Sequence, residues 1–174
     1  MTVVVLGAAG DVGAAVVAKL LEAGDEVGVV EPSAQEAERW RRAGAHVARG
    51  HPSDSDLIER AAQNARTIVV LEADEELVGA AIEGARLAGV ERIVATSGRA
   101  RSKVTARLRS SELDYVWLHT GNRLRAAAHP AQVAMAVDAA DDLPGHPRLE
   151  LALRTAEAWR LLRLDPPRRL SRRS

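Results

Sequence analysis

The chain has 174 residues, of which 47% are hydrophobic, so it is long enough for one domain with a packed core and is not expected to be disordered. Its 24 Lys and Arg residues balance its 24 Asp and Glu residues, which gives no sign of nucleic-acid binding, and the lack of cysteine excludes disulfides, thiolate metal sites and a Cys nucleophile. No apolar run approaches the roughly 20 residues of a membrane span, and the N-terminus lacks a basic leader, so we expect a soluble, cytoplasmic protein.

Strand-like and helix-like segments alternate along the chain from its first residues. Short apolar runs predict strands at Thr2–Leu6, Glu26–Val30, Ala45–Ala48, Thr67–Leu71, Arg92–Ala95, Tyr115–His119 and Arg148–Leu153. Apolar residues at helical spacing predict helices at Val12–Ala23, Ser33–Ala43, Asp54–Asn64, Glu75–Ala88, Arg101–Ser111, Ala131–Ala140 and Thr155–Leu162. This alternation predicts a doubly wound α/β fold of Rossmann type, with six or seven parallel strands and helices on both faces.

The stretch VVVLGAAGDVG at residues 3–13 carries the clearest functional signal. Gly7, Gly10 and Gly13 lie between a predicted strand and a predicted helix, where glycines permit a tight turn, close approach of a pyrophosphate and close helix–strand packing. The free N–H groups of the helix start would then face the phosphates. The alternative is a fold that keeps these glycines for packing only. Asp11 favours that alternative by charge repulsion, unless its carboxylate caps the helix.

Glu31 ends the second predicted strand, about 20 residues after the glycines. A carboxylate there can accept hydrogen bonds from the adenosine ribose and would repel a 2′-phosphate. We therefore expect the cofactor to be NAD(H) rather than NADP(H). The alternative is a surface glutamate beside a proline turn.

Three stretches resemble the NmrA-like, or atypical, short-chain dehydrogenase/reductase family: GAAGDVG, ELVGAAIEGARLAGVERIVATSG and LRSSELDYVWLHTGNRLR. The resemblance implies an NAD(P)-binding Rossmann domain, which we place at residues 1–164. The end of the chain, at 165–174, is proline-broken and basic, which predicts a flexible tail, the alternative being a site for an anionic partner. The resemblance also implies that a pyrophosphate would be lined by Gly7, Gly10, Asp11, Val12 and Gly13. His51 would stand near the adenine, where members often carry Asp. Leu71, Glu72 and Ala73 would border the path to the nicotinamide, and Thr96 and Ser97 would lie beside that ring.

The chain departs from the family's pattern where the chemistry is expected. The usual Tyr-x-x-x-Lys relay is missing, because Arg99 stands four residues before Lys103 and the single tyrosine, Tyr115, falls in a predicted core strand. Lys103 is either a proton-relay residue or part of a solvated helix face. His119 ends the sixth predicted strand, where its imidazole could act as acid or base or serve only a structural role.

The segment that walls the substrate pocket in family members is also short here, between LHTGNRLR and HPAQVA. The cleft would be open, or a second subunit would complete it in a homodimer. The leading hypothesis is a small reductase that transfers hydride between NAD(H) and a carbonyl or enone, with Ser97 orienting the oxygen and Lys103 or His119 handling the proton. The alternatives are a non-catalytic NAD(P)-sensing regulator that has no substrate, or an isomerase or cyclase on the same fold. We expect no metal site, because the histidines are scattered and no third ligand is suggested for any pair.

Overall fold

The computed structural model describes residues 2–98, 102–119, 130–153 and 156–164. The basic tail at 165–174 and the short segment after the sixth strand, at 120–129, therefore lie outside the described residues. The elements are β1 (Thr2–Leu6), α1 (Gly10–Glu22), β2 (Glu26–Glu31), α2 (Ala34–Arg42), β3 (His46–Arg49), α3 (Ser55–Ala61), β4 (Ala65–Val70), α4 (Glu75–Ala88), β5 (Arg92–Ser97), α5 (Ser102–Ser110), β6 (Asp114–His119), α6 (Pro130–Asp141), β7 (Arg148–Ala152) and α7 (Ala156–Leu161).

The strands form one seven-stranded sheet in the order β3-β2-β1-β4-β5-β6-β7, and every neighbouring pair is parallel. The predicted doubly wound α/β fold is therefore confirmed, at the upper end of the expected strand number. β5 continues two residues further than predicted, so Thr96 and Ser97 belong to the strand itself.

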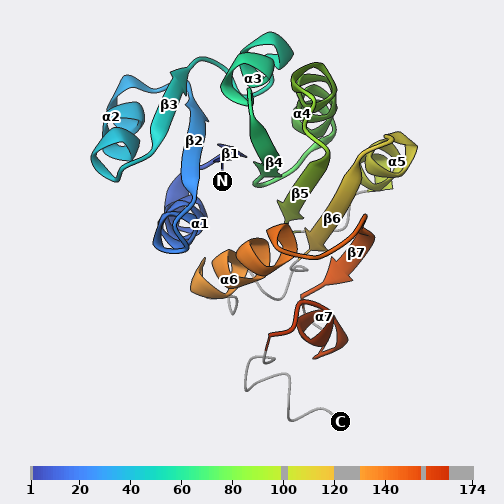
Figure 1. Ribbon diagram of the computed structural model, residues 1–174. Coiled ribbons are helices and arrows are strands. Elements are labelled where there is room, and N and C mark those ends of the chain that lie inside the picture. Colours follow the sequence, from blue (N-terminus) through green and yellow to red (C-terminus); the bar gives the residue numbers. More distant parts are fainter. Residues whose placement is uncertain (1, 99–101, 120–129, 154–155, 165–174) are drawn as a thin grey trace.

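Helices cover both faces of the sheet (Figure 1). α1, α6 and α7 pack on one face together with Trp40 of α2, in a core that includes Val16, Val137 and Trp159. α3, α4 and α5 pack on the other face, around Ile58, Val78 and other buried aliphatic side chains. The strands supply residues to both cores, as expected for a parallel sheet that is buried on each side.

Side-chain caps fix the starts of three helices. Ser33 accepts a hydrogen bond from the Glu36 N–H at the start of α2, and Asp54 and Asp74 cap α3 and α4 in the same way. Such caps satisfy N–H groups that the first helical turn leaves unpaired. α1 differs, because its N-cap is Ala9, which has no side-chain acceptor.

Candidate cofactor site at the carboxyl edge of the sheet

The carboxyl ends of the seven strands lie along one edge because all strands are parallel. The chain reverses its direction of winding between β1 and β4, which is the point where open α/β sheets bind ligands. The glycine loop follows β1 directly and therefore lies at this switch point.

Two of the three glycines are required by packing. A Cβ atom on Gly13 would lie 1.8 Å from the carbonyl oxygen of Ala8, and one on Gly7 would lie 2.6 Å from that of Leu71. No side chain fits at either distance, so these residues hold the loop against the helix and against the end of β4. Gly7 also has a φ of +72°, a conformation that favours glycine.

Gly10 has the opposite surroundings. It is exposed, it has a φ of +77°, and an added Cβ would meet nothing within 4 Å. Gly10 is the first residue of α1, and that helix has no side-chain cap to satisfy the N–H groups of its first turn. This arrangement fits a pyrophosphate, which would take the place of a cap. Asp11 lies exposed within the first turn of α1 and is not its N-cap residue.

The segment that follows β4 lies next to the glycine loop. Leu71 N–H donates to the Leu6 carbonyl at 2.9 Å, and Ala73 N–H donates to the Thr96 carbonyl at 2.7 Å. Leu71, Ala73 and Thr96 are buried, whereas Glu72 is exposed and has a φ of +52°. A non-glycine residue in this conformation costs on the order of 1 kcal/mol. The structure thus brings the ends of β1, β4 and β5 together, as the sequence predicts.

Glu31 is the last residue of β2, and His51 lies two residues past the end of β3. The Glu31 side chain is not extended into solvent: the residue is 7% exposed, and its Oε1 accepts a hydrogen bond from Ser33 N–H at 2.9 Å. His51 is exposed in the next loop, where its Nδ1 accepts from Ser53 N–H at 3.3 Å. A contact between His51 and adenine stays a prediction.

Sequence reasoning missed a residue beside Glu31. Arg49 ends β3 in register with Glu31, is exposed, and donates from Nη2 to the Pro32 carbonyl at 3.3 Å. Its guanidinium is therefore held at the turn between β2 and α2. The signal available in the sequence was an arginine at the last strand position before Gly50.

The candidate catalytic residues fall into two groups. Ser97 and His119 are register partners at the ends of β5 and β6, with Ser97 buried and His119 half-buried. Parallel register partners project from the same face of a sheet, so these two side chains lie side by side at the carboxyl edge. Tyr115, at 6% exposure, belongs to the core as predicted.

Lys103 lies apart from them on α5. Its Nζ pairs with Glu75 Oε2 of α4 at 2.8 Å, and its side chain is 77% exposed. The hydrogen bond from Lys103 lowers the pKa of the Glu75 carboxyl, against the opposing effect of desolvation and with smaller help from Arg107. This geometry matches the solvated helix face that the sequence left open as the alternative for Lys103.

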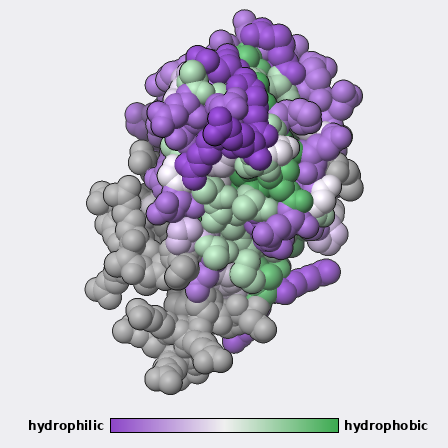
Figure 2. Space-filling model, turned by 90° about the vertical axis from the view of Figure 1, so that its left-hand side faces the viewer, coloured by the Kyte–Doolittle hydropathy of each residue, from purple (hydrophilic) through white to green (hydrophobic). Residues whose placement is uncertain are grey.

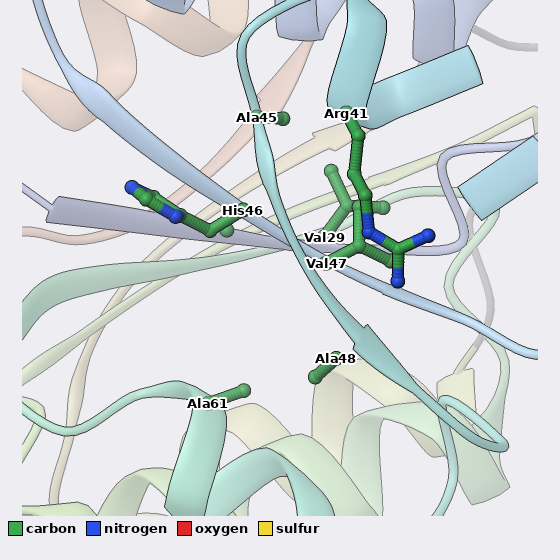
Figure 3. Close-up of a pocket in the computed structure, with 8 residues that line it drawn as sticks. Val29, Arg41, Ala45, His46, Val47, Ala48 and Ala61 are labelled. Carbon is green, nitrogen blue, oxygen red and sulfur yellow. The ribbon is translucent and has the colours of Figure 1, made fainter. Parts of the chain in front are cut away.

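A hollow of about 450 Å³ lies elsewhere, on the outer strand β3. It is lined mainly by small apolar residues of β2, β3 and α3, together with Arg41 and His46. Figure 3 shows Arg41 reaching down one side of β3 while His46 points away on the other, so the two polar groups do not converge. Figure 2, which views this side of the molecule, shows a band of apolar residues between polar ones. The hollow thus lacks the polar groups that would orient a dinucleotide.

Two further features concern metals and membranes. Within the described ranges, no three His, Asp or Glu residues are grouped so that they could hold a metal ion. Among the helices of the same ranges, none is both long enough and apolar enough to cross a membrane.

Comparison with known proteins supports the reading of the glycine loop. The model of the TrkA-N domain matches residues 3–117, which is more than half of the chain and runs from β1 into β6. The chain is thus an NAD(P)-binding Rossmann domain. Among curated proteins, none matches the sequence significantly.

Several solved structures share the fold. A triphenylmethane reductase from Citrobacter sp., complexed with NADP(H), superposes with a TM-score of 0.69 at 16% identity over 86% of this chain and 68% of that one. An NADPH-dependent quinone oxidoreductase from Escherichia coli, complexed with NADPH, gives 0.73 at 18% identity over 86% and 68%. ChuY, an anaerobillin reductase from Escherichia coli O157:H7, gives 0.71 at 17% identity over 87% and 96%. These neighbours fit the resemblance to a shortened atypical short-chain dehydrogenase/reductase.

The expected preference for NAD(H) is contradicted by this comparison. Both cofactor complexes described above contain NADP(H) or NADPH. The structure supplies a physical reason why an acidic residue was a misleading sign. The Glu31 carboxylate is turned into its own loop and bound by Ser33 N–H, while the side chain exposed at that place is the cationic Arg49.

Proposed function

Because the chain belongs to the TrkA-N domain family, we propose that it binds NADP(H) at the glycine loop and works as a small reductase on a carbonyl or enone. One observation carries the binding half of this proposal. Gly10 begins α1, which has no side-chain cap, at the switch point of the sheet, and an added Cβ at Gly10 would meet nothing within 4 Å. Packing explains why Gly7 and Gly13 are present, whereas Gly10 has no such contact and is favoured there only by its φ of +77°.

The catalytic half rests on the pair at the ends of β5 and β6. A bound nicotinamide would supply the hydride. The Ser97 hydroxyl would donate a hydrogen bond to the substrate oxygen, and the His119 imidazole would deliver the proton that completes reduction to an alcohol or a saturated carbonyl. We favour His119 over Lys103 for the proton, since His119 is the register partner of Ser97, whereas Lys103 lies apart on α5.

The binding proposal can be tested with two matched glycine variants. Gly10→Val and Gly24→Val introduce the same side chain at residues with φ of +77° and +89°, and an added Cβ at either residue meets no atom within 4 Å. They lie at opposite ends of α1, so backbone strain is alike and only Gly10 faces the proposed cradle. NADPH titration by fluorescence should show binding to the wild type and to Gly24→Val, and a loss of at least about tenfold in Gly10→Val. Equal effects of the two variants would refute a phosphate site at Gly10.

The catalytic proposal needs a separate measurement. We expect oxidation of NADPH in the presence of some members of a carbonyl and enone panel. His119→Ala should lower kcat while leaving the Kd for NADPH nearly unchanged, because His119 would act only on the substrate. Binding of NADPH without turnover across the panel would point instead to a non-catalytic NAD(P) binder.

A further inference from the structure

We infer that Arg49 recognises the 2′-phosphate of NADP(H). This inference rests on the proposed function and specifies how the same site selects its cofactor. Arg49, at the end of β3, would then select between NADP(H) and NAD(H), whereas the sequence analysis assigned this role to Glu31 at the end of β2.

The backbone places Arg49 within reach of the adenosine ribose. Arg49 and Glu31 are register partners on adjacent parallel strands, which lie about 4.8 Å apart. In a dinucleotide-binding sheet the ribose lies over the end of β2. An arginine on the neighbouring strand end therefore reaches the same place without standing in the β2–α2 turn itself.

The guanidinium is both oriented and available. Its bond to the Pro32 carbonyl holds it at the β2–α2 turn, and the residue is exposed. That bond uses one of five N–H donors, and the planar group is suited to bidentate contact with phosphate oxygens.

The acidic groups near this place are already engaged. Glu31 is 7% exposed and accepts from Ser33 N–H, and the Glu36 carboxylate pairs with Arg39 at 3.1 Å. Ser33, the N-cap of α2, is exposed and carries a hydroxyl that can donate to an anion. A phosphate beside Arg49 would also meet the positive end of the α2 dipole. The exposed charge at this place is therefore that of Arg49, while the Glu31 carboxylate is buried behind it and opposes the phosphate more weakly.

Calorimetric titration of the full chain with NADPH, NADH, 2′,5′-ADP and 5′-AMP tests the inference. Arg49→Met removes the charge, Arg49→Lys keeps the charge without the planar fork, and Arg42→Met removes an exposed arginine from the far end of α2 as a control. In Arg49→Met we expect NADPH and 2′,5′-ADP to bind about 10- to 100-fold more weakly, and NADH and 5′-AMP to change less than about twofold. Arg49→Lys should fall between Arg49→Met and the wild type, and Arg42→Met should match the wild type.

The outcomes separate this inference from the proposed function. Unchanged NADPH binding in Arg49→Met, or equal weakening of NADPH and NADH, would overturn the role of Arg49 while leaving the cofactor site in place. A wild type that binds NADH more tightly than NADPH would overturn it in the same way. A wild type that binds none of the four probes would overturn both.

Discussion

Removing Arg66 should destabilise the protein far more than removing a typical surface arginine. Arg66, near the start of β4, pairs through its guanidinium with Asp25 at 2.9 Å and with Asp141 at the end of α6. The Asp141 side chain is fully buried, and its Oδ1 has no hydrogen-bond partner within the described part of the chain. The hydrogen bond that Arg66 donates to the Asp141 carboxylate is the largest influence on Arg66, and it raises the pKa of the guanidinium above its usual value. Arg66→Met would therefore leave a buried carboxylate without its counter-charge.

The loss of stability in Arg66→Met can be estimated from the burial of the Arg66–Asp141 pair. Breaking a buried ion pair by removing one partner costs about 3–5 kcal/mol. The additional contact with Asp142, whose side chain is 73% exposed, contributes less than about 1 kcal/mol. With a urea m-value of about 2 kcal/mol/M, the midpoint of unfolding should fall by about 1.5–2.5 M.

Urea unfolding of three variants tests this reasoning. Arg86→Met is the control, because Arg86 pairs with Glu83 at 2.6 Å but both side chains are largely exposed, so its loss should cost less than about 1 kcal/mol. Adding Asp141→Leu to Arg66→Met removes the stranded charge and should recover at least about half of the loss. If Arg66→Met costs no more than Arg86→Met, burial of the pair does not govern its contribution and the reasoning fails.

Three further outcomes are expected. Gly13→Ala should cost about 3 kcal/mol or more in urea unfolding, because its Cβ would lie 1.8 Å from the Ala8 carbonyl oxygen; a loss below about 1 kcal/mol would show that the loop can relax. Asp138→Asn should stabilise the protein near pH 7 by less than about 1 kcal/mol. Desolvation and nearby carboxylates raise the pKa of Asp138, despite Lys19 at 3.7 Å. Ionisation of Asp138 therefore reduces the stability of the fold as pH rises through and above the ordinary carboxyl range. The gain should therefore grow between about pH 4 and pH 7, and an opposite trend would reverse the sign assigned to this group. Glu31→Gln keeps an acceptor for Ser33 N–H but removes a negative charge, so calorimetry should show tighter binding of NADPH, and weaker binding would mean that the carboxylate itself contacts the ribose.

Most of the fold could be predicted from the sequence because its signals are local. The apolar period and the C-terminal glycine predict α4 at the residues where the structure has it, Glu75–Ala88. Buried strands appear as short apolar runs, and the alternation of strands and helices leaves few topologies open.

The candidate site could be predicted only where it depends on the backbone. The glycine loop can be recognised from the spacing of its three glycines between a strand pattern and a helix pattern, and the structure has it between β1 and α1 as predicted. The bond from Ser33 N–H to the Glu31 carboxylate depends on the detailed path of the β2–α2 turn, and the pairing of Lys103 with Glu75 depends on the packing of α5 against α4. Spacing along the chain reveals neither. Arg49 was overlooked for the same reason, because its relation to Glu31 comes from the register of β2 with β3.

The cluster around Arg66 lies at the amino ends of the strands, at the opposite end of the sheet from the glycine loop. There it ties together the turn before β2, the start of β4 and the end of α6. α6 is therefore anchored at the end of the sheet that carries no part of the candidate site. Among the loops at the carboxyl edge, those other than the packed glycine loop should tolerate sequence changes best, so we expect them to be the practical choice for a library of redesigned binding loops.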